Sequence, residues 1–176
     1  MVFAYYHRLS SGQKRVYRQS DQITSLPLPQ ATTLHPLVAA LAAGLEAQDQ
    51  RRIQHICQQL SDAITTRLRV APVRVELLAV RPTDDWGELH GLYDPASGHK
   101  RSVVQLWMRT AHHKRIVAFK TFLRTLLHEL CHHLDYELLQ LSDSFHTEGF
   151  YKRLSSLFHQ LMRTGDALAG SASLAD

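Results

Sequence analysis

The chain has 176 residues and a formal charge of +4, and 44% of its residues are hydrophobic while 20% are charged. This composition is ordinary for a folded globular domain and excludes a largely disordered or fibrous chain. No stretch approaches the ~18 apolar residues of a membrane-spanning helix, so we expect no membrane partner. The modest basic excess attracts acidic partners weakly, and charge alone supports no more than a weak association with DNA.

Cys57 and Cys131 are the two cysteines of the chain, and each falls within an amphipathic helical pattern. A small buried thiol is the usual occupant of such a position, so we expect no disulfide framework. The first ten residues carry Tyr5, Tyr6 and Arg8 instead of an uninterrupted apolar core, which does not fit a secretory signal. Together these features predict a reducing, cytoplasmic location.

The length fits one folded domain with additions at both ends. Residues 1–33 are polar and are expected to form an N-terminal arm and linker, with a short helix at 13–18 and an extended Leu-Pro-Leu-Pro segment at 26–29. Residues 34–164 carry the patterns of the folded domain. Residues 165–176 are predicted to form a flexible tail.

Apolar spacing predicts the elements of the folded domain. Spacings of three and four residues predict helices at 35–45, 53–68, 115–139 and 147–162, the first two being separate or one helix bent near 48–50. Alternation predicts a strand at 73–81, and two further strands are predicted at 88–93 and 102–108, on either side of a hairpin-loop composition at 94–98. The economical arrangement is an α+β fold with N-terminal helices, a three-stranded antiparallel sheet and two further helices.

The helix at 115–139 contains the motif His-Glu-Leu-Cys-His at 128–132. Histidine is abundant in this chain, at twelve copies, but the motif lies in an unbroken helical pattern with leucines facing a core around it. Because residues four apart share one helix face, His128 and His132 can bind one metal ion. Glu129 lies beside them, where a carboxylate can take a proton from water without being a ligand. The motif predicts a Zn2+ site with Glu129 as general base.

A catalytic zinc ion has three protein ligands and one position for water, so a third ligand is expected after His132. There are four candidates: His133, Glu137, His146 and Glu148. His133 and Glu137 point away from the metal face of the helix. His146 follows a turn that can fold back over that face, and it is the predicted third ligand. Glu148 competes with it, because a glutamate from a following helix completes other zinc peptidase sites.

Asp135 lies three residues beyond His132, on nearly the same face of the helix. It could accept a hydrogen bond from a ligand imidazole and fix its tautomer, or it could be an exposed helix charge. Asp135 and Leu138 also stand where metzincins have a glycine and a third histidine ligand. That family is therefore excluded.

The segment 125–154 resembles the SprT-like (Spartan-type) zinc metallopeptidases, through HELCH at 128–132 and DSFHTEGFY at 143–151. The resemblance extends more weakly over residues 50–162 and leaves 1–33 unexplained. It implies a small zincin-like domain in which His146 is the third zinc ligand. It also implies hydrolysis of peptide bonds in protein substrates, which in some relatives are crosslinked to DNA. Many relatives carry a four-cysteine zinc ribbon, but no cysteine follows Cys131 here.

The sequence thus predicts a zinc metalloendopeptidase, with an edge strand at 88–93 or 102–108 able to pair with an extended protein substrate. Tyr151 could stabilise the oxyanion of the transition state, although packing is the commoner role of a tyrosine. The alternatives are a non-catalytic, zinc-stabilised interaction module, a DNA-associated module, and an inhibitory or toxin-like peptidase with one target. The intact Glu129 argues against a purely structural zinc site, which needs no carboxylate there.

Overall fold

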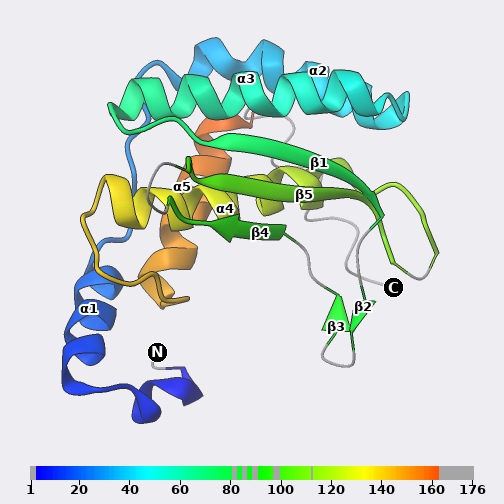
Figure 1. Cartoon of the computed structure of the whole chain (residues 1–176). Helices are drawn as coiled ribbons and strands as arrows, with labels where there is room; N and C mark the ends of the chain where they lie inside the picture. The colour runs from blue at the N-terminus through cyan, green and yellow to red at the C-terminus, as the bar shows by residue number, and fades with distance from the viewer. Residues whose placement is uncertain are drawn as a thin grey trace, which may run out of the picture.

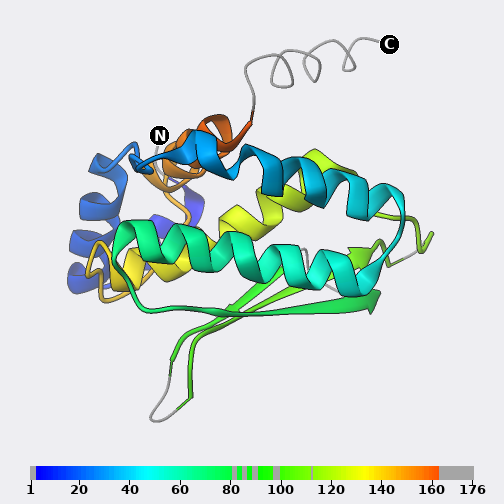
Figure 2. The ribbon, with the colours of Figure 1, turned by 90° about the horizontal axis from the view of Figure 1, so that it is seen from above.

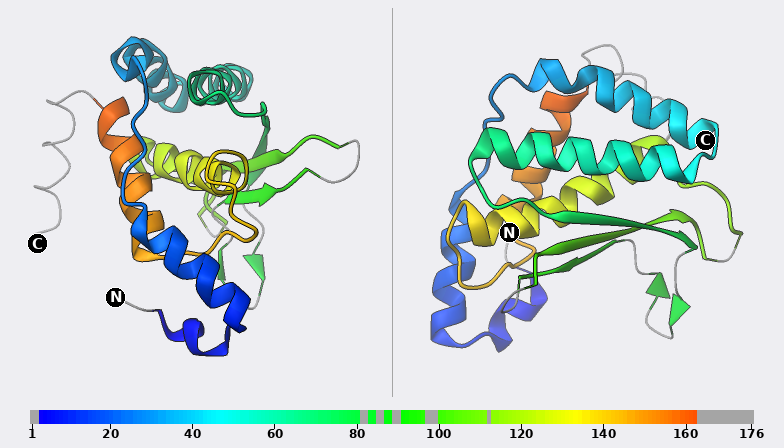
Figure 3. Two further views of the ribbon diagram at one scale, coloured as in Figure 1. Left: turned by 90° about the vertical axis from the view of Figure 1, so that its left-hand side faces the viewer. Right: turned by 45° about the horizontal axis from the view of Figure 1, so that its top comes forward.

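A layer of helices covers one face of a small sheet (Figures 1 and 3). The structure is a computed structural model that describes residues 3–80, 83–84, 87–88, 91–96, 100–111 and 113–162. Its helices are α1 (Ser11–Gln22), α2 (His35–Glu46), α3 (Gln50–Leu68), α4 (Phe119–Glu137) and α5 (Glu148–Leu161). Its strands are β1 (Arg74–Val80), β2 (Thr83–Asp84), β3 (Gly87–Glu88), β4 (Gly91–Asp94) and β5 (Val103–Arg109). The α+β class is confirmed, and the predicted tail at 165–176 lies outside the described residues.

The main sheet is mixed, so the predicted antiparallel sheet is wrong. Its strand order is β1-β5-β4, and β2 and β3 form a separate pair. β4 runs antiparallel to β5, whereas β1 runs parallel to it, with Val75 opposite Val104 and Leu77 opposite Leu106. All four of these side chains are buried, as alternation predicted for Val75 and Leu77. Alternation shows which face a residue occupies, but it is the same for either direction of pairing.

The outer edge of β1 is covered by three glutamines of α3. Gln58 accepts a hydrogen bond from the N–H of Val75 at 2.8 Å, and Gln54 accepts one from the N–H of Leu77 at 2.6 Å. The side-chain amides of Gln54, Gln58 and Gln50 donate to carbonyl groups of the same edge. An uncovered edge would leave these backbone groups unpaired. β4 is therefore the open edge of this sheet in the part of the chain that the structure describes.

The helix boundaries follow from local signals. α2 and α3 are two helices, running side by side in opposite directions (Figure 2). The chain turns at Gln48, whose φ is 55°, and α3 then begins after Asp49, whose carboxylate accepts the N–H of Arg52 at 3.0 Å. Cys57 and Cys131 are both buried, as their helical patterns predicted.

The N-terminal residues pack against the domain. The predicted short helix is α1, which lies beside α5 (Figure 1). Leu26 and Leu28 of the predicted linker are each only 4% exposed. Gln160 of α5 accepts the N–H of Leu28 and donates to the carbonyl of Leu26, both at 2.8 Å. This extended segment belongs to the core, but its apolar residues alternate with prolines and so resemble a linker in sequence.

A fully buried ion pair joins α1, α4 and α5. Nη2 of Arg153 lies 2.8 Å from Oδ1 of Asp135, and neither side chain is exposed to solvent. The guanidinium also donates to the carbonyls of Ser20 and Ile23, at 2.6 Å each. These carbonyls lie in the last turn of α1 and at its C-cap, Ile23, where helix carbonyls lack i+4 partners; the carbonyl of Ser20 also accepts the N–H of Ile23 at 3.3 Å. From its place on α5, Arg153 therefore bonds groups of both α1 and α4, and so joins the three helices.

We expect Arg153→Met to lower the free energy of unfolding by about 3–5 kcal/mol, because it leaves the Asp135 carboxylate buried without a cation. Urea unfolding measures this as a lower midpoint. Lys152→Met is the matched control, because Lys152 is the neighbouring residue and its ion pair with Glu148 is solvent-exposed. Equal midpoints for Arg153→Met and the unmodified protein would contradict the prediction.

Candidate metal centre

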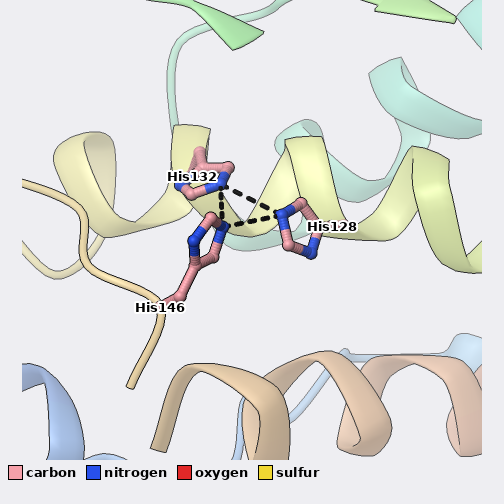
Figure 4. A group of neighbouring side chains, drawn as sticks. All are labelled: His128, His132 and His146. Carbon is pink, nitrogen blue, oxygen red and sulfur yellow. Dashed lines mark hydrogen bonds between the residues drawn. The ribbon is translucent and has the colours of Figure 1, made fainter. Parts of the chain in front are cut away.

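Three histidine side chains converge on one point beside α4 (Figure 4). His128 and His132 project from α4, and His146 projects from the loop between α4 and α5. Their Nε2 atoms are separated by 3.2 Å (128 to 132), 3.1 Å (132 to 146) and 2.9 Å (128 to 146). Within the described part of the chain, these three form the group of residues close enough together to hold a metal ion.

The spacing of the three nitrogens fits a tetrahedral zinc ion. Zinc binds imidazole at about 2.0–2.1 Å, which places two tetrahedral ligands about 3.3 Å apart, a few tenths of an ångström from the distances found. Burial, with smaller contributions from the nearby His128 and His146, lowers the pKa of His132 to about 3. Burial also lowers the pKa of His146. Both rings are therefore neutral at pH 7, and neutral imidazole is the form that binds metal.

The tautomer of His132 is fixed by a hydrogen-bond chain that ends in the buried ion pair. Ser144 Oγ donates to Oδ2 of Asp135 at 2.7 Å, and it lies 2.7 Å from Nδ1 of His132. The single proton of the Ser144 hydroxyl is donated to Asp135, so the Ser144 oxygen can only accept a hydrogen bond from His132. Nδ1 of His132 therefore carries the ring proton, and the lone pair of Nε2 is left to bind a metal. Burial raises the pKa of Asp135, while the Arg153 guanidinium and the Ser144 hydroxyl oppose that effect. Asp135 therefore orients the imidazole through Ser144, a residue that the sequence analysis did not single out.

The other candidates for third ligand lie outside this group. His133 points away as expected, but it is fully buried. Its Nε2 lies 2.8 Å from the carbonyl of Ala71 and its Nδ1 lies 3.1 Å from the hydroxyl of Tyr93. Glu148 starts α5 and pairs with Lys152 at 2.8 Å. Glu137 is the last residue of α4.

The loop that carries His146 is held by N-terminal residues. The hydroxyl of Tyr5 donates to the carbonyl of His146 at 2.8 Å. The N–H of Gly149 donates to Oδ1 of Asp21 at 2.9 Å. A Cβ at Gly149 would lie 2.5 Å from the carbonyl oxygen of Asp21, so this approach requires glycine. Residues of the predicted arm therefore help to position the third histidine.

Phe150 forms an apolar wall behind the three histidines. Its ring centroid lies 5.0 Å from that of His128, 4.8 Å from that of His132 and 5.2 Å from that of His146. Phe150 is fully buried, so it excludes water from that side of the site. Spacing had assigned it only to the apolar stripe of the last helix. Tyr151, the proposed oxyanion residue, is 41% exposed and its ring lies 5.9 Å from that of His146.

Glu129 lies with the three histidines in a cleft of about 660 Å³, which is lined by α4, β4 and the 144–146 loop. Burial raises the pKa of Glu129 to about 7, and a hydrogen bond from the backbone of Tyr93 opposes that rise. Gly91 packs directly on the carboxylate, since a Cβ there would lie 2.5 Å from Oε1. The open strand β4 thus holds the carboxylate in place from across the cleft.

Comparisons of the chain with protein-family models, curated proteins and solved structures find no match. No helix among the described residues is long and apolar enough to cross a membrane. The function must therefore be inferred from the geometry of the site itself.

We expect His146→Ala to weaken Zn2+ binding by more than the ~10–100-fold typical of losing an outer hydrogen-bond partner, because it removes a converging nitrogen. Ser144→Ala should weaken Zn2+ binding by an amount within that range, because it removes the hydrogen-bond acceptor for Nδ1 of His132. Competition with a chromophoric chelator measures both. Glu148→Gln is the control and should bind Zn2+ unchanged; a larger loss for Glu148→Gln than for His146→Ala would contradict the ligand assignment.

Proposed function

We propose that the protein is a zinc-dependent metalloendopeptidase of the SprT-like, zincin type, which hydrolyses peptide bonds in protein substrates. The observation that carries the proposal is the position of Glu129, a carboxylate beside three converging imidazoles in an open cleft. A structural zinc site closes its fourth position with a cysteine or a histidine. Cys131 and His133, the nearest such residues in sequence, are fully buried and do not belong to the group.

The side chains around the site have the roles that peptide hydrolysis requires. A zinc ion held by the three imidazoles would supply Lewis acidity, which would polarise a carbonyl and lower the pKa of water. Glu129 takes a proton from the attacking water at a carboxylate oxygen and returns it to the departing amide nitrogen. Gly91 and the backbone of Tyr93 fix that carboxylate. Ser144 and Asp135 keep the proton of His132 on Nδ1.

The position of strand β4 favours the binding of an extended peptide. It is the open edge of the sheet, and Gly91, Leu92 and Tyr93 line the cleft beside Glu129. The segment 102–108, considered as another edge, forms the central strand β5 and has no open side. Pairing with a strand edge uses main-chain hydrogen bonds, which any peptide can supply. This mode suits an enzyme that cleaves within protein chains.

We expect Glu129→Gln to retain zinc and to lose peptidase activity by on the order of 10²–10⁴, because glutamine keeps the size of the side chain but cannot take up the proton. Metal analysis and cleavage of casein, or of the chain itself, measure the two properties on the same samples. Zinc bound by both proteins with cleavage by neither would contradict a general peptidase and favour a zinc-stabilised interaction module or a peptidase with one dedicated target. Absence of zinc from both would contradict the metal site.

A second variant tests the position of the carboxylate. We expect Gly91→Ala to lower kcat by on the order of 10²-fold, because the new Cβ would stand 2.5 Å from Oε1 of Glu129 and displace it. Zinc affinity should be preserved. Gly12→Ala is the matched control, because the nearest atom that its Cβ meets is 4.0 Å away. Full activity of Gly91→Ala would show that Glu129 does not depend on this contact.

A further inference from the structure

The cleft contains one arginine that the proposed chemistry does not use. Arg124 lies one helical turn before His128 on α4 and lines the same cleft. Its guanidinium carbon lies 4.0 Å from the centre of the Phe158 ring on α5. Phe158 is buried and Arg124 is exposed. A cation is thus fixed between α4 and α5 at the mouth of the site.

The contact with Phe158 leaves the hydrogen-bonding groups of Arg124 available. Stacking on an aromatic ring orients a guanidinium through its flat face, while its N–H donors lie in the plane and remain free for a ligand. No carboxylate of the described residues pairs with it. Glu129 is the one acid among the described residues that line the cleft, and it is held by β4. The guanidinium of Arg124 is therefore available to bind an anionic group of another molecule.

The distance along α4 between Arg124 and the histidines determines which part of a bound substrate Arg124 can contact. Four residues of helix advance by about 6 Å, and an extended peptide advances by about 3.3 Å per residue. A peptide lying along the cleft therefore presents to Arg124 a group about two residues from the bond at the histidines. Thr121, Thr125 and Leu154, which line the cleft at this end, carry no charge.

We propose that Arg124 is a specificity-determining residue that binds a carboxylate of the substrate about two residues from the scissile bond. The proposal rests on the proposed peptidase function. A guanidinium pairs with a carboxylate through two parallel hydrogen bonds, which gives direction as well as charge. A nucleic-acid phosphate backbone is the less suitable ligand, because its binding depends on several cations acting together, and Arg124 is the one lysine or arginine among the described residues that line this cleft.

The test uses peptides amidated at the C-terminus, in matched pairs that differ by Glu or Gln at one position. We expect kcat/KM to favour Glu by about tenfold or more at one position near the cleaved bond. Arg124→Gln should reduce that ratio to about one, and Arg124→Glu should make the same position favour Lys. Arg51→Gln, which removes an equal charge from α3 outside the cleft, should keep the preference for Glu.

The outcomes separate this proposal from the peptidase itself. Cleavage without a preference for Glu at any position, or a preference that Arg124→Gln retains, overturns the role of Arg124 and leaves the peptidase standing. Absence of all cleavage overturns the proposed function. In that case fluorescence anisotropy of the same peptides on Glu129→Gln still tests Arg124, and equal binding of the Glu and Gln peptides overturns the inference.

Two further arms identify the source of the carboxylate. In the first, peptides with a free C-terminus are compared with the amidated ones. If kcat/KM depends on Arg124 only for peptides with a free C-terminus, Arg124 binds the terminal carboxylate of the substrate instead of an acidic side chain. A labelled single-stranded oligonucleotide tests the phosphate alternative. If Arg124→Gln abolishes binding of that oligonucleotide while peptides show no preference, the proposal is overturned and Arg124 is a phosphate contact.

Discussion

The buried pair of Arg153 and Asp135 is the constraint on which the rest of the structure depends. Burying a guanidinium is costly unless its N–H groups find acceptors, and in Arg153 both Nη atoms have acceptors while the buried Nε has none. Here those acceptors come from the end of α1 and from Asp135 on α4. The second oxygen of Asp135 then accepts a hydrogen bond from the hydroxyl of Ser144, and the Ser144 oxygen accepts one from Nδ1–H of His132. The interaction that brings the three helices together thus also selects the tautomer of a predicted metal ligand.

It follows that the N-terminal residues form part of the site's support. Arg153 needs the carbonyl groups at the end of α1, and Asp21 holds the first turn of α5 through Gly149. Tyr5 bonds the backbone of His146 itself. A metal site whose ligands come from a helix and a loop needs the loop to be held, because loops are otherwise the more mobile element. Here the holding groups come from the beginning of the chain.

The sequence predicted the part of the site that one helix determines. His128, Glu129 and His132 are placed by the helix period alone, so their spacing was sufficient. His146 lies in a loop, which the helix period does not place. It was preferred to Glu148 because the turn before it can return over the helix, and the resemblance to SprT-like peptidases implies the same ligand. The contributions of Gly91 and Phe150 were missed because each acts through a contact with a residue far away in sequence. The direction of β1 was missed for the same reason, since pairing partners are not encoded in alternation.

The two edges of the sheet differ in a way that bears on how a substrate could be held. The glutamines of α3 occupy the hydrogen-bonding groups of β1, so a peptide cannot add there. β4 has no such row of glutamines among the described residues; its backbone at Tyr93 bonds the carboxylate of Glu129, and its Gly91 packs against that carboxylate. A peptide paired with β4 would therefore be aligned by the same strand that positions the proposed base. Backbone pairing carries no sequence information, so any selectivity must come from side chains such as Arg124 that reach the cleft from the helices.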